Sequence, residues 1–198
     1  IAGEGAQQAD IDVIRKTYGL DRPLLVQYLD WLWKTLRGDF GTSIYFKTDV
    51  SELVLAKMPV TLILGLTSLA FALLISIPLG VLAAIYANSW IDRVALAVAV
   101  FGQAMPNFFF ALILVMLFSI TLRWLPVSGS ATWQHYIMPT VALGYYAAPA
   151  FMRLIRAGMI EVLSADYIRT ARAKGLPSGK IIFKHALRNA VVPVVALA

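Results

Sequence analysis

The chain has 198 residues, of which 60% are hydrophobic and only 14% are charged, and its mean hydropathy is +0.75. A soluble globular domain has about 45–50% apolar and about 25% charged residues. Stretches of 34, 29 and 29 uncharged residues follow Lys57, Arg93 and Arg123, whereas about 20 apolar residues suffice to cross a bilayer. The composition excludes an ordinary soluble enzyme, a disordered chain and a DNA-binding domain, and it predicts an all-α, polytopic protein embedded in the lipid bilayer.

The net charge of +6 is unevenly distributed along the chain. Residues 1–58 hold seven basic and eight acidic side chains, and residues 59–198 hold ten basic and three acidic ones. In a membrane protein, clustered Lys and Arg mark the cytoplasmic side, so we interpret the basic part as a topology signal and expect no nucleic-acid partner. The chain has no cysteine, which excludes disulfides and Cys-ligated metals.

Residues 1–58 are predicted to form an amphipathic region that does not span the membrane. A helix capped by Asp21 and stopped at Gly38 would carry many leucines on one face, with Trp31 and Trp33 beside them. Such a helix either lies on a membrane surface or packs against a neighbouring subunit. The alternative is a small polar cap packed on itself.

Three membrane spans and part of a fourth are predicted in residues 59–198. We expect them at about residues 59–87, 94–122, 136–160 and, incompletely, 190–198. Pro78, Pro106 and Pro149 lie inside the first three and are candidate kinks, a structural role that we favour over a gating role. Since the last apolar stretch is only half a span long, we expect the chain to be a piece of a longer protein.

The orientation follows from the loop between the third and fourth spans. Between Arg153 and Arg188 there are eight Lys/Arg against two acidic residues, which predicts that residues 161–189 are cytoplasmic. Residues 1–58 and 123–135 then fall on the outer side.

The sequence offers no catalytic centre, and we expect no cofactor or metal. The segment Gly175–Lys180 departs from a phosphate-binding loop in spacing and lacks its Ser/Thr, and the two histidines, His135 and His185, are predicted on opposite sides of the membrane. The first two spans contain no ionisable residue, which argues against a self-powered ion-coupled carrier. We therefore predict that the chain is not an enzyme.

The cytoplasmic loop contains one short helix with its own start and stop signals. Ser164 is the expected N-cap, Asp166 lies in the first turn, Gly175 fits a left-handed stop and Pro177 prevents continuation. An isolated helix of about ten residues is marginal in water, so we expect it to dock on a partner. The alternative is a solvated basic loop that only sets topology.

Several segments together resemble one known family. They are the run from Asp166 to Gly175, His185-Ala-Leu-Arg-Asn-Ala, Val192-Pro-Val, Tyr18-Gly-Leu-Asp-Arg-Pro, Gly38-Asp-Phe-Gly-Thr-Ser, Ile77-Pro-Leu-Gly-Val-Leu-Ala-Ala and Gln134-His-Tyr-Ile-Met-Pro. In order and over nearly all of the chain, these resemble the permeases of ABC importers for dipeptides, oligopeptides, nickel and glutathione. Aligned on Gly175, the general Glu-Ala-Ala motif of importer permeases falls on Arg169, Thr170 and Ala171, of which only Ala171 matches.

The resemblance implies a type I ABC importer transmembrane fold, of which this chain is a fragment of a six-span subunit in a bacterial inner membrane. In the family the loop helix docks in a cleft of the ATPase, which here implicates Ser164, Asp166, Tyr167, Arg169, Thr170, Ala171, Arg172, Ala173, Lys174 and Gly175. The implied partners are a second permease subunit, two cytoplasmic ATPase subunits that hydrolyse ATP, and a periplasmic solute-binding protein.

The substrate class implied by the resemblance is a di- or oligopeptide, with nickel and glutathione as alternatives. Residues 1–58 would be periplasmic and residues 59–198 would form the transmembrane domain. The alternative functions are an ion-coupled secondary carrier or channel with an unrelated basic loop, and a membrane scaffold that transports nothing.

Overall fold

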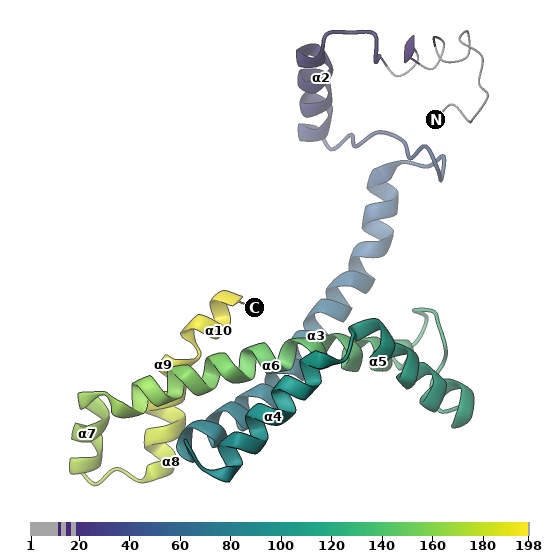
Figure 1. The fold of residues 1–198 in the computed structure, drawn as a ribbon. Helices are drawn as coiled ribbons and strands as arrows, with labels where there is room; N and C mark the ends of the chain where they lie inside the picture. The colour runs from purple at the N-terminus through teal and green to yellow at the C-terminus, as the bar shows by residue number, and fades with distance from the viewer. Residues whose placement is uncertain (1–11, 13–14, 17–18, 198) are drawn as a thin grey trace. The chain divides into compact units, whose positions relative to one another are not determined.

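The computed structural model describes residues 12, 15–16 and 19–197, so most of the first 18 residues, Tyr18 included, lie outside the described part. The described residues are mostly helical and contain no strand, only an isolated bridge between Thr42 and Asp49 (Figure 1). The chain divides into two compact units, residues 1–61 and residues 62–198. The elements are α2 (Leu24–Leu36), α3 (Val50–Ile85), α4 (Trp90–Ala104), α5 (Asn107–Leu114), η1 (Val115–Thr121), α6 (Gln134–Ser164), α7 (Asp166–Ala173), α8 (Ser178–Lys180), η2 (Ile181–Ala186), α9 (Leu187–Ala190) and α10 (Val192–Leu197), where η marks π-helix.

The first unit contains the amphipathic helix α2, and its apolar side chains are exposed. Its N-cap is Pro23, without a side-chain cap, so the prediction that Asp21 caps the helix is wrong. Pro23 has no side-chain oxygen to accept the free N–H groups of the first turn, so α2 starts without a side-chain cap. Gly38 has a φ of +84°, which confirms the predicted stop.

Helix α3 is longer than the apolar stretch that predicted it. It starts at Val50, nine residues before the predicted 59, and ends at Ile85. The residues before Pro59 include Glu52 and Lys57, which a hydropathy limit excludes but which are good helix formers. The predicted non-spanning region 1–58 therefore contributes the first turns of α3.

The second apolar stretch is broken at Pro106, where the chain bends by 90° between α4 and the helix that follows. Met105 has an extended backbone (φ −85°, ψ 126°) because the proline ring disfavours helical geometry in the residue before it. Pro106 then acts as the N-cap of α5. The predicted single span 94–122 is thus two helical arms, α4 and α5 with η1.

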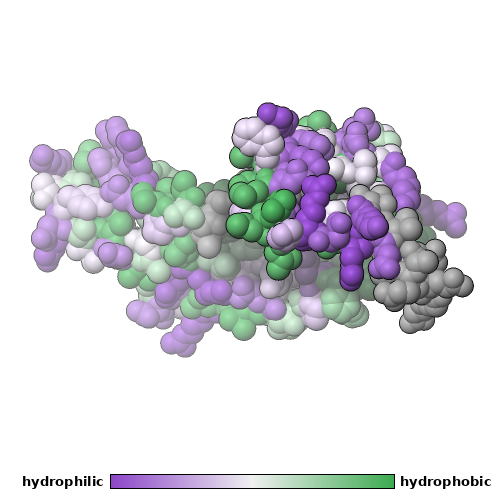
Figure 2. Space-filling view, turned by 90° about the horizontal axis from the view of Figure 1, so that it is seen from above, coloured by the Kyte–Doolittle hydropathy of each residue, from purple (hydrophilic) through white to green (hydrophobic). Residues whose placement is uncertain are grey.

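Among the described residues, only α3 is by itself long and apolar enough to cross a membrane. Helix α4 together with α5 and η1, which are separated from it by the bend at Pro106, is a second candidate if the two arms form one span. Only 17% of the most apolar part of α3 is buried. Figure 2 shows hydrophobic side chains exposed beside hydrophilic ones on the face in view. The predicted third span corresponds to α6, which has 31 residues but a more polar composition than α3.

Within the second unit, α6 packs directly on α3 at two glycines. A Cβ atom on Gly144 would lie 2.6 Å from the Phe71 ring, and one on Gly80 would lie 2.9 Å from Ile155. Next to the first contact, the hydroxyls of Thr67 and Thr140 are 2.8 Å apart and hydrogen bonded. The two helices approach so closely because small residues and paired hydroxyls line their interface.

Candidate functional site

Helix α7 begins one residue later than its sequence predicts. Ser164 is the last residue of α6, and its Oγ donates to the Glu161 carbonyl at 2.7 Å, so the prediction that Ser164 is the N-cap is wrong. Ala165, in an extended conformation, ends α6 and starts α7 at once. A serine side chain can bond back to a carbonyl three residues earlier as well as cap a following helix, and Ser164 does the former. Asp166 lies in the first turn as predicted.

The end of α7 is a Schellman stop built on Gly175. This glycine has a φ of +73°, its N–H donates to the Arg172 carbonyl at 2.9 Å, and the N–H of Leu176 donates to the Ala171 carbonyl at 3.3 Å. These two bonds and the left-handed residue define the motif. The predicted left-handed stop is confirmed.

One face of α7 is buried against the chain itself. Ile168 is 0% and Ala171 is 8% exposed, and both belong to the core that includes Ile155 and Met159 of α6 and Ile181 of η2. The alignment with the permease motif suggested that Ala171 lies on an exposed docking face. The structure instead buries its side chain in the core of the unit. Its small side chain instead lets α7 pack closely on the rest of the unit.

The opposite face of α7 is exposed and basic. The side chains of Arg169 and Asp166 are 78% and 96% exposed and form only a 3.5 Å ion pair with each other. Of the predicted site residues, only Ala171 is buried, and the structure leaves the others exposed: Ser164, Asp166, Tyr167, Arg169, Thr170, Arg172, Ala173, Lys174 and Gly175. A partner that meets this face would encounter three cations and one anion.

The short helix α9, which follows the π-helix η2, is joined to α7 by a side-chain hydrogen bond. Asn189 of α9 donates through Nδ2 to the Tyr167 hydroxyl at 2.9 Å. With the apolar contacts of Ile168, this bond fixes α7 to the segment that leads to α10. The loop 161–189 is therefore a packed structure and not a free solvated loop.

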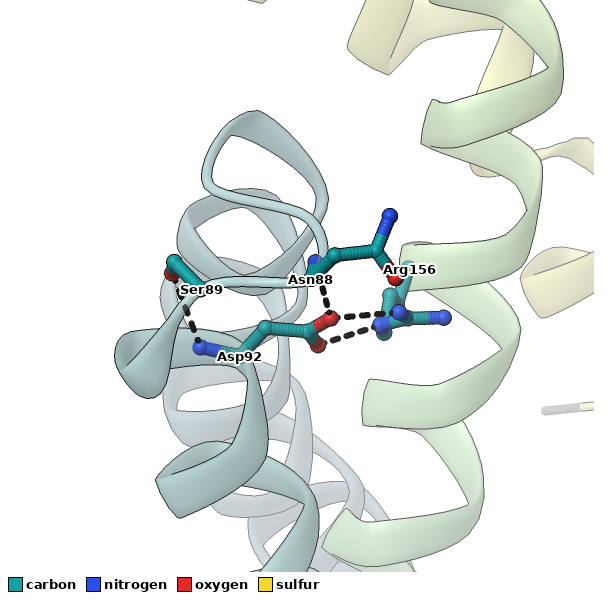
Figure 3. Close-up of polar contacts among 4 residues, drawn as sticks. All are labelled: Asn88, Ser89, Asp92 and Arg156. Atoms are coloured by element: carbon teal, nitrogen blue, oxygen red, sulfur yellow. Dashed lines mark hydrogen bonds and ion pairs between the residues drawn. The ribbon is translucent and has the colours of Figure 1, made fainter.

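A buried ion pair joins α4 to α6 about three turns before α7. Arg156 donates through Nε and Nη2 to the two carboxylate oxygens of Asp92, each at 2.6 Å, and the side chain of Asp92 is 3% exposed (Figure 3). The carboxylate also accepts the backbone N–H of Asn88 at 2.9 Å, and it lies in the first turn of α4, where the helix dipole favours an anion. Ser89 caps the same turn.

Sequence reasoning missed this pair, although a signal was present. Asp92 is the single acidic residue between Glu52 and Glu161, and Arg153 and Arg156 are two cations inside an apolar stretch. Ionisable residues among apolar helices pair with one another. Arg153 is also used, since its Nη1 donates to Gln103 of α4 at 2.9 Å.

The three candidate kink prolines have different surroundings. Pro78 is exposed on α3, which continues through it, and Pro149 is buried in α6, which also continues through it. Pro106 lies at the 90° bend. Among residues 12, 15–16 and 19–197, no three His, Cys, Asp or Glu side chains are grouped so as to hold a metal ion.

A helix long and apolar enough to cross a membrane, and the close packing of α6 on α3, agree with a helical membrane protein. A family model described as "Binding-protein-dependent transport system inner membrane component" matches residues 76–198, and the chain belongs to this family. It is an ABC importer permease family, as the sequence resemblance predicted. This membership does not favour the ion-coupled carrier or channel that the sequence left open.

Curated relatives extend the similarity over the whole chain. This chain is 42% identical over 197 residues to the glutathione transport system permease protein GsiC of Salmonella choleraesuis (strain SC-B67). It is 39% identical to the protein of the same name in Escherichia coli (strain K12). In both cases the alignment covers 100% of this chain and 64% of the relative. The chain thus spans less than two-thirds of the length of these permeases.

Proposed function

We propose that the chain is part of the permease subunit of an ATP-driven importer that moves glutathione or a related short peptide across a bacterial inner membrane. The observation that carries this proposal is the 42% identity, over all of the chain, to proteins named as glutathione transport permeases. Glutathione is a tripeptide, so it falls within the peptide class expected from the sequence resemblance. Nickel and longer peptides are the alternatives.

The partners in this proposal are a second permease subunit, two cytoplasmic ATPase subunits and a periplasmic solute-binding protein. ATP hydrolysis belongs to the ATPase subunits. The basic loop 161–189 faces the cytoplasm, which its excess of Lys and Arg supports, and residues 1–58 face the periplasm.

Coupling to the ATPase uses the exposed face of α7. Its cations, Arg169, Arg172 and Lys174, present a positive surface to the ATPase, while Ile168 and Ala171 hold the helix to the permease core. A displacement of α7 is transmitted to α6, its immediate neighbour in the chain. Through the Asp92–Arg156 pair it is transmitted to α4 as well.

Helix α2 lies in the membrane interface in this proposal. Its leucines and aromatic side chains are exposed around most of the helix, and its polar side is narrow, with a 3.0 Å ion pair between Asp30 and Lys34. Trp31, Trp33 and Tyr28 are the residue types that prefer the headgroup level. A lipid surface would cover the apolar face that no described residue buries.

The test is transport by the full-length native subunit, reconstituted with its partner permease, ATPase subunits and binding protein. We expect labelled glutathione to enter proteoliposomes only with ATP on the ATPase side, and an excess of unlabelled dipeptide to measure the breadth of the substrate class. Glutathione uptake driven by a proton or sodium gradient without ATP would contradict the proposal. ATP-dependent uptake of nickel but not of glutathione would show that the substrate is nickel, the alternative named above.

A further inference from the structure

One buried hydroxyl in the helical core has no hydrogen-bond partner in the described part of the chain. The Ser76 side chain, on α3, is 0% exposed, and its Oγ bonds to nothing. The neighbouring hydroxyls of α3 behave differently, because Ser68 donates to the Leu64 carbonyl and Thr67 pairs with Thr140. A buried hydroxyl without a partner destabilises the folded state, so Ser76 needs an explanation.

Ser76 borders a small cavity between α3, α4 and α6. The cavity has a volume of about 80 Å³, and its walls are mostly apolar, formed by residues such as Leu79, Val98 and Met152. One water molecule needs only about 10–15 Å³ on this measure. The cavity has room for water but needs polar groups to hold it.

A residue with a backbone carbonyl that lacks its helical donor also lines this cavity. Pro149 of α6 is buried and has no N–H, so the carbonyl of Tyr145, four residues earlier, lacks the donor that an α-helix would supply. Tyr145 and Pro149 both line the cavity, as Ser76 does. The residues around this water-sized space thus include an unpaired hydroxyl on α3 and, on α6, a carbonyl without its helical donor.

We propose that this cavity is a binding site for an ordered water molecule that accepts a hydrogen bond from Ser76 Oγ and donates one to the Tyr145 carbonyl. The water replaces the bond that Pro149 removes from α6 and joins α6 to α3. The inference does not rest on the proposed transport function. It explains how α6 continues through a buried proline.

The test is X-ray radiolytic labelling of the full-length permease in nanodiscs, read by mass spectrometry. Ordered water releases hydroxyl radicals beside it, so a methionine next to the site is oxidised although bulk solvent cannot reach it. Met152 lines the cavity and is 2% exposed, whereas Met159, two turns further along α6, is 0% exposed and does not line it. We expect Met152 to be oxidised several times faster than Met159.

Two variants make the test specific to the proposed partners. Ser76→Ala removes the donor, and Pro149→Ala returns an N–H to the Tyr145 carbonyl, so each should bring the oxidation rate of Met152 down towards that of Met159. Comparison of each variant's near-ultraviolet circular dichroism with wild type shows whether the fold is retained. Equal rates at Met152 and Met159 in the wild type would overturn the proposal, and so would a Met152 rate that is unchanged in a folded Ser76→Ala variant.

Discussion

Asp92 and Arg156, 64 residues apart in the sequence, form a two-point ion pair that fixes the first turn of α4 to α6. Both charges lie largely out of solvent, and every carboxylate oxygen has a partner. Breaking such a pair leaves one uncompensated buried charge, which is far more destabilising than losing a surface contact.

We therefore predict that Asp92→Ala strongly destabilises the permease. The expected loss is about 3–5 kcal/mol because Arg156 is left unpaired. The double change Asp92→Leu with Arg156→Met should recover much of this loss. Thermal unfolding of the purified subunit measures both changes in stability. The control is Asp166→Asn, at a side chain that is 96% exposed, which should unfold at the same temperature as the wild type. Equal stability of Asp92→Ala and wild type would show that the pair contributes nothing.

The stop of α7 depends on a left-handed residue at position 175. Gly175→Val should strain this position by about 1–2 kcal/mol and fray the last turn. Gly179 is the matched control, because it has no positive φ and nothing lies within 4 Å of its added Cβ. In the reconstituted complex, Gly175→Val should lower uptake and stimulated ATP hydrolysis together, while Gly179→Ala should leave both near wild type. If Gly175→Val shows wild-type uptake and stimulated ATP hydrolysis, the left-handed stop of α7 is not needed for coupling.

The two faces of α7 predict opposite results for two alanines. Ala171→Glu places a charge in the core beside Ile168 and should destabilise the subunit by several kcal/mol. Ala173→Glu changes the exposed face, so the subunit should unfold at the wild-type temperature but retain its ATPase partner less well. Co-purification of the ATPase and thermal unfolding separate the two effects. If Ala173→Glu retains the ATPase fully, the exposed face is not the docking surface.

The orientation can be tested with single introduced cysteines, because these 198 residues contain none of their own; any cysteine elsewhere in the full-length subunit is first replaced by serine. A cysteine at Ser130 should react with an impermeant maleimide in intact spheroplasts, whereas one at Ser178 should react only after the membrane is opened. Both serines are exposed, so access to the side chain does not differ between them. Labelling of Ser178→Cys in intact cells would reverse the proposed topology.

The interfacial position of α2 predicts quenching of its tryptophans by lipid. In a variant with Trp31 as the single tryptophan, brominated acyl chains should quench fluorescence more strongly than a soluble quencher such as acrylamide. Trp31→Asp should weaken the association of an isolated α2 peptide with vesicles. Equal access of acrylamide to Trp31 with and without lipid would show that lipid does not cover α2.

Local chemistry predicted the parts of this structure that depend on neighbours in sequence. Gly175 and Gly38 stop their helices because a left-handed residue ends a helix wherever it occurs, and the break at Pro106 follows from the geometry of proline itself. The prediction that Ser164 caps α7 failed because α6 and α7 are separated by one residue. The same serine suits the end of α6 and the start of α7.

Long-range packing determined what the sequence left open. The burial of Ala171 depends on α6 and η2, which no helical periodicity places beside it. The Asp92–Arg156 pair depends on which faces of α4 and α6 meet, and the close approach at Gly80 and Gly144 decides that for α3 and α6. These relationships become visible only when the helices are placed in space.

The unbroken length of α6 has a mechanical consequence. Its 31 residues make a rod of about 46 Å, with α7 at one end. A lever of this length amplifies small rotations, since a tilt of about 5° at one end moves the other by about 4 Å. The displacement at the far end of α6 then depends on how stiff the helix is at Pro149. If α6 bends at Pro149, a movement of α7 produces a smaller displacement at the far end than it would in a rigid helix.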